Sequence, residues 1–262
     1  MGVPAGLRAL GLHRHFQAPR RSLPNRRALV ITTSHDRLGP GGAKTGVFAS
    51  EMTAPYYAFL DAGMLVDIAS IRGGVIPIEP MSLSWPVRSS SDRRYLKDEA
   101  FRGKVGASLP VSMVDGARYD AVFLAGGWGA AYDFEQSEDL GRLLLQAFDA
   151  GAVIGGVCHG PLGLLAARRG GDQPLVRGRH LTAVSDKQVR ELGVSHTPRH
   201  PERELRAAGA AYEGDTAFRD IFASHVVADG RLVTGQNQND GARVADRMMQ
   251  VILAPAAARS SE

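Results

Sequence analysis

The sequence predicts an α/β fold with a doubly wound, mostly parallel sheet, helices on both faces and a small inserted cap. Short apolar runs rich in β-branched residues alternate with helical patterns of about ten to fifteen residues. One run ends in two glycines, and another ends at a cysteine that a second apolar run soon follows. In such sheets, ligand sites form at the carboxyl ends of the strands.

The first half of the chain contains three expected strands and one expected helix. "ALVITT" (28–33) and "MLVDIAS" (64–70) are short apolar runs typical of buried strands. Residues 45–63 between them carry apolar side chains at helical spacing, and the pattern stops at Gly63. "YDAVFLAGG" (119–127) predicts a further strand.

A helix, a strand and another helix are expected next. "SEDLGRLLLQAFDAG" (137–151) has a serine cap and a terminal glycine, as helices often do. "AVIGGV" (152–157) predicts a strand, and "GPLGLLAARR" (160–169) predicts a helix directly after it.

The last part of the chain predicts three strands and a final helix. "HLTAV" (180–184) is one expected strand. "HVVADGRLVTG" (225–235) predicts a strand pair joined at "DG". An amphipathic pattern over 240–254 predicts the closing helix.

One domain with two loose ends is expected. Residues 71–118 interrupt the alternation, and we interpret them as an insertion that forms a cap beside the site. The domain is expected to span 28–254, followed by a short tail at 255–262. Residues 1–27 are expected to be a basic, disordered extension, or the result of a start codon assigned too early. Their arginine-rich, acid-free composition also resembles a transit peptide, although one serine is few for that.

Composition excludes several classes of function. The chain has 262 residues, 44% hydrophobic and 22% charged, as in ordinary globular proteins. Its net charge of +4 is concentrated in residues 1–27, with six Arg, two His and no acid, so no nucleic-acid partner is expected. No apolar run approaches the roughly 20 residues of a membrane helix. A single cysteine permits no internal disulfide, which favours a reducing, cytoplasmic setting.

That single cysteine, Cys158, lies where a strand is expected to turn sharply into a helix. This is the geometry of a nucleophile elbow, in which small neighbours relieve crowding, and Gly156 and Gly160 are such neighbours. A thiol at a helix N-terminus is expected to have a lowered pKa. The alternative is a buried cysteine that acts only as a small hydrophobic residue.

The stretch "GGVCHGPLGLLA" resembles the nucleophile turn of the ThiJ/PfpI superfamily, whose fold is similar to class I glutamine amidotransferases. The heat-shock chaperone and glyoxalase III branch fits best. "TGVFASEMTAPYYAFLDAGMLVDIAS", "YDAVFLAGGWGAAYDF" and "HVVADGRLVTGQNQNDGARVAD" resemble further parts of that branch. The resemblance covers roughly 29–254 and implies a flavodoxin-like fold.

The resemblance implies catalytic roles for Cys158, His159 and Glu51. A carboxyl group beside a thiol can accept or donate a proton, and burial raises its pKa toward neutrality. The resemblance implies that His159 is a base or proton shuttle. Otherwise, Glu51 is a solvated helix residue and His159 a polar cap.

The glycine-rich loop is expected to bind the substrate oxygen. Gly126 and Gly127 allow a close backbone approach, and the amides of Gly127 and Trp128 are candidate oxyanion donors. Otherwise these are plain turn glycines.

The third member of the triad departs from the family pattern. The family commonly has an acid that orients the histidine, and this position falls at Gln188 or Val189 here. Asp186 and Glu191 flank it and are possible partners of His159; otherwise the histidine has no acidic partner. An imidazole without such a partner is less basic and less fixed.

A cluster of His and Glu residues and an amide-rich loop are two further candidates for ligand binding. "SHTPRHPERE" contains His196, His200, Glu202 and Glu204, but the spacing is no standard zinc pattern, so a helix start with solvated charges is expected. "GQNQND" (235–240) either lines the pocket or is a plain loop between hairpin and helix.

The leading hypothesis is a glyoxalase III-like lyase of the D-lactate dehydratase type. It would convert methylglyoxal or a similar 2-oxoaldehyde to a 2-hydroxy acid, with no glutathione, organic cofactor, nucleotide or metal. The alternatives are another thiol hydrolase or hydratase, or a non-enzymatic stress chaperone or redox sensor in which Cys158 is oxidised. A homodimer is possible because relatives often form dimers. The exact substrate and the role of residues 1–27 stay open.

Overall fold

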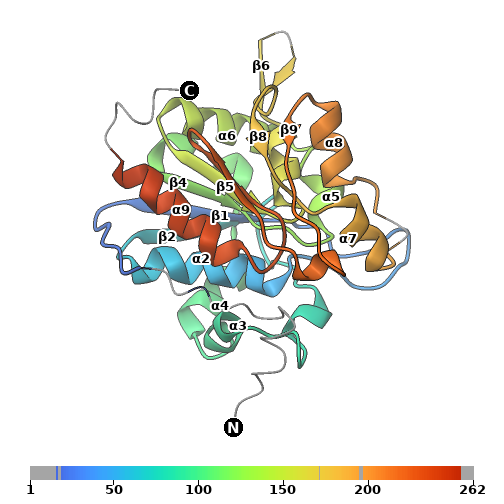
Figure 1. Ribbon diagram of the computed structural model, residues 1–262. Helices are drawn as coiled ribbons and strands as arrows, with labels where there is room; N and C mark the ends of the chain where they lie inside the picture. Colours follow the sequence, from blue (N-terminus) through green and yellow to red (C-terminus); the bar gives the residue numbers. More distant parts are fainter. Residues whose placement is uncertain (1–15, 17–18, 171, 195–196, 255–262) are drawn as a thin grey trace.

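A seven-stranded sheet forms the centre of the computed structural model (Figure 1), which describes residues 16, 19–170, 172–194 and 197–254. The strand order is β10-β11-β5-β4-β1-β2-β3, and β10 with β11 is the antiparallel pair. The predicted fold class is therefore confirmed. The strands are β1 (Arg27–Thr32), β2 (Leu65–Ser70), β3 (Leu109–Pro110), β4 (Ala121–Leu124), β5 (Val153–Val157), β6 (Arg168–Arg169), β7 (Gln173–Pro174), β8 (His180–Leu181), β9 (Ala211–Tyr212), β10 (Val226–Asp229) and β11 (Leu232–Gly235).

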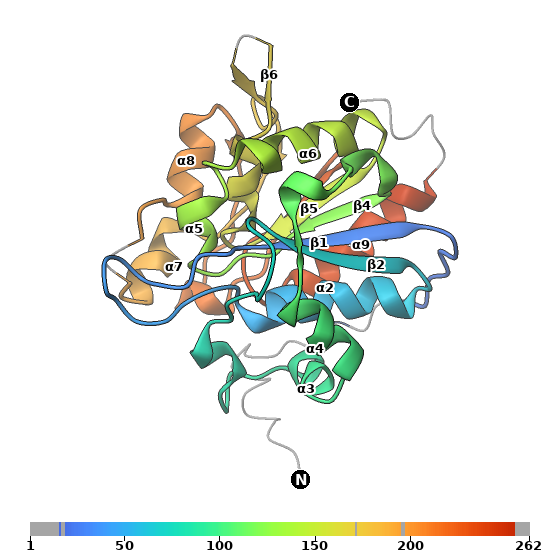
Figure 2. The same ribbon diagram turned by 180° about the vertical axis from the view of Figure 1, so that it is seen from behind.

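Helices cover both faces of this sheet, as predicted. α2 and α9 lie side by side on one face (Figure 1), and α6 lies on the other (Figure 2). The α-helices are α2 (Ala49–Asp61), α3 (Ser90–Tyr95), α4 (Glu99–Gly106), α5 (Ala130–Asp133), α6 (Glu138–Asp149), α7 (Asp186–Glu191), α8 (Pro201–Ala207) and α9 (Gly241–Leu253). The 3-10 helices are η1 (Pro80–Leu83), η2 (Val111–Met113), η3 (Gly116–Arg118), η4 (Gly160–Leu165) and η5 (Asp220–Phe222).

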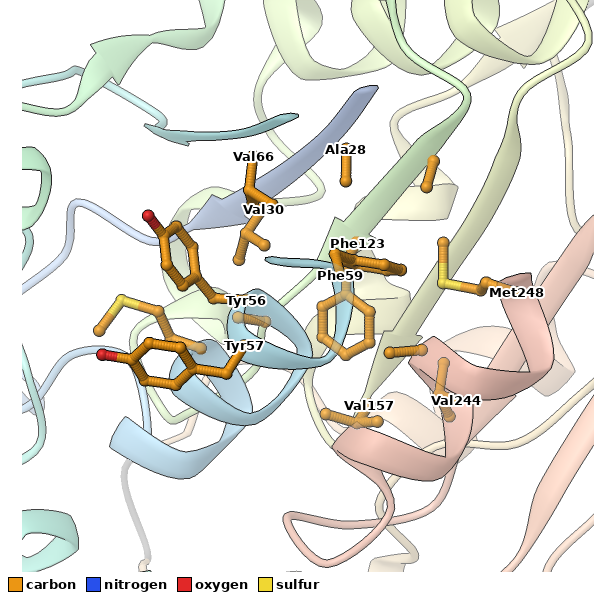
Figure 3. Packing of buried hydrophobic residues seen from close by; sticks show 14 of the residues in the cluster. Ala28, Val30, Tyr56, Tyr57, Phe59, Val66, Phe123, Val157, Val244 and Met248 are labelled. Carbon is orange, nitrogen blue, oxygen red and sulfur yellow. The ribbon is translucent and has the colours of Figure 1, made fainter. Parts of the chain in front are cut away.

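The core is divided by the sheet into two clusters. Along β1, Ala28 and Val30 belong to the cluster under α2 and α9, while Leu29 and Ile31 belong to the other cluster. Successive side chains of a strand point to opposite faces, so an uninterrupted apolar run is needed where both faces are covered. Figure 3 shows the first cluster, in which Ala28 and Val30 lie with aromatic side chains of α2.

Two of the predicted elements are wrong in type or place. Residues 160–169 were expected to form a helix, but only the 3-10 helix η4 forms, and β6 follows it. A Cβ at Gly160 would lie 2.1 Å from the Leu124 carbonyl oxygen of β4, and one at Gly163 would lie 3.2 Å from side chains of β4 and α6, so this segment packs closely on both elements. "HLTAV" (180–184) forms only the short β8, which pairs with β9 outside the main sheet.

The segment 71–118 holds η1, α3 and α4, and then returns to the sheet as β3. Figures 1 and 2 both show α3 and α4 on the side of the molecule where α2 lies, and Lys104 of α4 donates to the Val66 carbonyl of β2. The start of α3 is well defined, because Ser89 and Asp92 form a capping box. We call residues 80–95 the cap segment below.

Part of the basic N-terminal segment belongs to the fold, contrary to expectation. Residues 19–27 are described, whereas residues 1–15, 17–18 and the predicted tail at 255–262 lie outside the described residues. Leu23 is buried in the core, and its amide donates to the Ala62 carbonyl. The Arg21 guanidinium donates to the Asp246 carboxylate at 2.5 and 3.2 Å. The apolar contact of Leu23 and the ion pair of Arg21 therefore hold this N-terminal segment against α2 and α9.

We expect Arg21→Ala to lower the free energy of unfolding by about 1–3 kcal/mol, because it leaves a buried carboxylate short of a partner. The Asp246 side chain is 4% exposed, and from the described residues it keeps one further bond, donated by Gln250 at 2.7 Å. Urea unfolding measures the change. Arg20→Ala is the matched control, since Arg20 is exposed. Equal stability of both variants would contradict this anchoring role.

Within the described part of the chain, no helix is long and apolar enough to cross a bilayer.

Candidate active site

The candidate site lies where β4, β5 and α2 meet. Cys158 follows β5, the glycine-rich loop follows β4, and Glu51 is in the first turn of α2. Side chains from these three places line one cavity of about 670 Å³. The lining includes Glu51, Gly127, Trp128, Cys158 and His159.

Cys158 occupies a strained turn. Its φ is 57°, in the left-handed region that non-glycine residues seldom adopt. Its amide donates to the Gly235 carbonyl at 3.2 Å, and its carbonyl accepts from the Val184 amide at 3.1 Å. A Cβ at Gly160 would lie 2.1 Å from the Leu124 carbonyl oxygen, so the chain can turn here only with glycine. This is the geometry expected of a nucleophile elbow.

Glu51 is a buried carboxyl group facing this thiol. It is 1% exposed, and it interacts with the Cys158 side chain and the Gly126 amide. Burial raises the pKa of Glu51 to about 8, the neighbouring Cys158 side chain and Gly126 amide lower it by less, and the nearby Asp240 charge raises it further. Glu51 is therefore mostly protonated at neutral pH, while a minor ionised fraction is a stronger base than an ordinary carboxylate.

The thiol does not have the lowered pKa that its position suggested. Burial raises the pKa of Cys158 well above its ordinary value, and the Glu51 carboxyl raises it further. Backbone hydrogen bonds from His159 and Gly127 lower it, but by less. The chain after Cys158 is a short 3-10 helix, not an α-helix, so the expected dipole of a regular helix is also missing. The resting cysteine is a neutral thiol.

His159 is held beside the sulfur as a neutral imidazole. Its Nδ1 lies 3.3 Å from the Cys158 sulfur, and its ring lies 4.8 Å from the Trp128 ring. Burial lowers the pKa of His159 to about 3, and the charge of His200 contributes. Its buried Nε2 has no hydrogen-bond partner among the described residues. A neutral imidazole with one unoccupied nitrogen can pass a proton but does not supply a positive charge.

One of the two expected amide donors lies near the sulfur, and the second amide there is a different one. Gly127 and Trp128 were the expected donors, whereas the amides near the sulfur are those of Gly127 and His159. Gly127 has a φ of 104°, which favours glycine, and a Cβ there would lie 2.4 Å from the Gly46 carbonyl oxygen. Trp128 lines the cavity and packs its ring near His159.

The chain matches the model of the DJ-1/PfpI family over residues 43–250. The chain belongs to the DJ-1/PfpI family. The glutathione-independent glyoxalase HSP31 of Saccharomyces cerevisiae is 29% identical over 224 residues, which cover 82% of this chain and 92% of that protein. The probable glutathione-independent glyoxalase hsp3103 of Schizosaccharomyces pombe is 28% identical and covers 88% of this chain and all of that protein.

Two solved structures with similar folds superpose on most of the chain. Rapid Encystment Protein 24 kDa of Francisella tularensis has a TM-score of 0.81 and 30% identity, covering 87% of this chain and 100% of that one. Glyoxalase III of Candida albicans has a TM-score of 0.73 at 24% identity, covering 86% of this chain and 97% of that one. The latter likeness supports the fold.

Members of the DJ-1/PfpI family were expected to have an acid that orients the histidine. Neither Asp186 nor Glu191, the two candidates here, is found paired with His159. Asp186 pairs with His200, at 3.5 Å between its Oδ1 and the imidazole Nδ1. Glu191 accepts from the Asp220 amide at 2.8 Å. Gln188 lines the cavity instead, and its Oε1 is buried without a partner among the described residues.

We therefore expect Asp186→Asn and Glu191→Gln to change kcat/KM by less than about threefold, because both carboxylates are engaged away from His159. Aldehyde consumption by each purified variant tests this. A loss of more than about tenfold in either variant would show that its carboxylate orients the histidine in solution.

Gly126 holds the Glu51 carboxyl and the elbow together. A Cβ there would lie 2.5 Å from Glu51 Oε2 and 2.7 Å from both the His159 amide and the Val157 carbonyl. Since two of these atoms are backbone, neither a rotamer change nor a small shift removes the clash.

We expect Gly126→Ala to lower kcat/KM by at least about a hundredfold and the unfolding free energy by about 1–3 kcal/mol. Gly103→Ala is the control, because no atom lies within 4 Å of its added Cβ inside α4. Its stability should rise by up to about 1 kcal/mol. Wild-type kinetics in the Gly126 variant would contradict the close packing.

The loop 235–240 serves both expected purposes. Gln238 and Asn239 line the cavity. Asn237 is buried and donates to the Ala223 carbonyl at 2.5 Å, so it holds the loop. Sequence reasoning missed Asp240, a buried acid with a raised pKa that accepts from Ser224 and whose charge raises the pKa of Glu51. Asp240 stands at the N-cap position of α9, where an aspartate is common, so its type and position in the sequence do not indicate an effect on the pKa of Glu51.

The histidine cluster mostly forms local contacts. His196 lies outside the described residues. His200 precedes α8 as its N-cap but makes no side-chain cap, and Glu202 accepts from the Asp186 amide. Arg199 pairs with Glu204 at 3.8 Å. Among the described residues, no three His, Cys, Asp or Glu side chains form a group that could hold a metal ion.

Proposed function

We propose that the protein is a cysteine-dependent, glutathione-independent glyoxalase of the lyase class. It converts methylglyoxal, or a similar 2-oxoaldehyde, to a 2-hydroxy acid. The observation that carries this proposal is the buried Glu51 carboxyl, with a pKa of about 8, against the thiol of Cys158 at the strained elbow. The names of the yeast relatives agree with it.

Attack begins with proton transfer from the thiol. The ionised fraction of Glu51 takes the Cys158 proton as the sulfur adds to the aldehyde carbon, and the developing oxyanion gains a proton to give a hemithioacetal. The amides of Gly127 and His159, which already face the sulfur, are placed to stabilise that oxyanion. No free thiolate is needed at rest.

A proton shift and hydrolysis complete the reaction. The proton on C1 of the hemithioacetal is removed, an enediol forms, and a proton returns at C2, which gives a 2-hydroxy thioester. Glu51 and the neutral His159 are the two groups beside the sulfur that can carry these protons. Water then cleaves the thioester, releasing the 2-hydroxy acid and restoring the thiol.

Lactate production from methylglyoxal in glutathione-free buffer tests the proposal. We expect steady formation of D-lactate by the wild-type protein, detected with a stereospecific assay. Folded protein that forms no lactate, or forms it only with added glutathione, would overturn the proposed function. Release of ammonia from amide substrates in place of lactate would favour the hydrolase alternative.

A further inference from the structure

The cavity that reaches Cys158 is far larger than methylglyoxal requires. Its volume of about 670 Å³ is within the range that proteins use for drug-sized ligands. Methylglyoxal is a three-carbon molecule, so most of the cavity would stay unfilled around it. The outer part of the cavity is therefore available for a larger substituent on the aldehyde.

The cap segment gives this outer part an apolar wall. Met81 and Trp85 line the cavity although 51% and 71% of their surfaces are exposed. Leu192, 37% exposed, also lines it. Large apolar side chains left open at a cavity mouth are typical of ligand sites, because a bound apolar group removes their surface from water.

The same wall carries an excess of positive charge. Arg88, Arg93 and Arg94 line the cavity, and Asp61 is the carboxylate at this outer part. Asp61 is already bound by Arg94, whose two nitrogens donate to it at 2.7 and 2.9 Å.

Arg94 and Arg88 differ in what holds them. The Arg94 guanidinium also lies 3.9 Å over the Tyr57 ring, so it is fixed in place. The Arg88 guanidinium forms no hydrogen bond or ion pair with any residue that the structure describes. Deeper in the cavity, Glu51 is mostly protonated at neutral pH and adds little negative charge. Arg88 is thus a cation at the mouth with its donors available.

We propose that the substrate is a 2-oxoaldehyde with a bulky apolar body and an anionic end, bound by Trp85 and Arg88 respectively. This inference rests on the proposed function and leaves its chemistry unchanged: the aldehyde carbon reacts with Cys158, and the rest of the molecule extends toward the cap segment. A planar guanidinium binds a carboxylate through two hydrogen bonds, which suits an acid at the end of the substituent.

Three aldehydes test the proposal on the full-length protein: methylglyoxal, phenylglyoxal and 4-carboxyphenylglyoxal. We expect kcat/KM to rise in that order, with about a tenfold gain from the carboxylate, as expected for a charge-assisted hydrogen bond. Arg88→Gln should reduce the ratio between the carboxylated and the plain aryl substrate to near one. Trp85→Ala should reduce the ratio between phenylglyoxal and methylglyoxal.

The charge control is Arg118→Gln, which removes an exposed arginine of η3 outside the cavity lining. We expect it to keep the wild-type ratios. Three results for the ratio of kcat/KM between the carboxylated and the plain aryl substrate would overturn the inference. They are a ratio near one in the wild type, a wild-type ratio in Arg88→Gln, and a ratio in Arg118→Gln that falls as far as in Arg88→Gln. If methylglyoxal is turned over but neither aryl substrate is preferred, the proposed function stands and this inference fails. If no aldehyde is turned over, the proposed function itself fails.

Discussion

Cys158→Ala should abolish aldehyde turnover, lowering kcat/KM by at least about a thousandfold, because the sulfur forms the covalent bond on which every later step depends. Since Cys158 is the sole cysteine, no other thiol in the chain can replace it. The measurement is lactate formation under glutathione-free conditions.

A comparison of the loss of kcat/KM with the change in stability distinguishes a catalytic role of Cys158 from a role in packing. The side chain is small and buried, so its truncation should change the unfolding free energy by no more than about 1–2 kcal/mol. Cys158→Ser is the matched control, since it keeps the size and the strained φ of 57° but places a far weaker acid beside Glu51. It too should be inactive and folded. Residual turnover above about a tenth of wild type in either variant would contradict covalent catalysis.

Glu51→Gln should lower kcat/KM by about a hundredfold to ten-thousandfold, because an amide cannot take the thiol proton. The pH profile should change as well. With a pKa of about 8 for Glu51, wild-type kcat/KM should rise with pH up to about 8. The variant should lack this rise. Initial rates across the pH range, at low substrate concentration, measure both.

The stability of the same variant is a control with a defined sign. The pKa of Glu51 is raised from 4.5 to about 8 in the folded protein, so between these values the folded state binds more protons than the unfolded state. Stability of the wild type therefore falls as pH rises through this window, and Glu51→Gln removes that fall. A variant whose Tm declines as steeply as the wild type across this window would show that Glu51 is not buried as a neutral acid.

Much of the fold could be predicted from apolar periodicity. β1, β2, β4 and β5 are short, mostly apolar runs, as expected for strands of a sheet that is covered on both faces. The turn at Cys158 could be predicted because glycine at 160 is required by a backbone contact of 2.1 Å. A backbone contact this close requires glycine, and a required glycine can be recognised in the sequence.

The misassigned segments depend on contacts between distant parts of the chain. Residues 160–169 have apolar spacing typical of a helix, but they form one 3-10 segment whose glycines pack closely on β4 and α6. Residues 182–184 of "HLTAV" pair with no strand that the structure describes; the Thr182 amide donates to the Thr234 side chain and the Val184 amide to the Cys158 carbonyl. Neither partner is close in sequence, so neither outcome could be read locally.

The electrostatics of the site were hardest to predict. Sequence reasoning placed Cys158 at a helix start and expected a lowered pKa, yet burial and the Glu51 carboxyl raise it. The burial of Glu51 and the direction of its pKa shift were expected correctly. The pKa of Cys158 depends on which neighbouring groups are buried with it. Those neighbours come from α2, β5 and the loop before α9, which are far apart in the sequence.

A titration of the single cysteine tests the central claim most directly, namely that Cys158 is a neutral thiol that Glu51 activates only as the aldehyde is attacked. Protein labelled with carbon-13 at cysteine Cβ gives one resonance whose shift reports the charge on the sulfur. Our account predicts that the resonance stays in the thiol position while the pH rises through the range in which an ordinary cysteine ionises, because burial and the Glu51 carboxyl raise the pKa of Cys158. A resonance already in the thiolate position at neutral pH would contradict it.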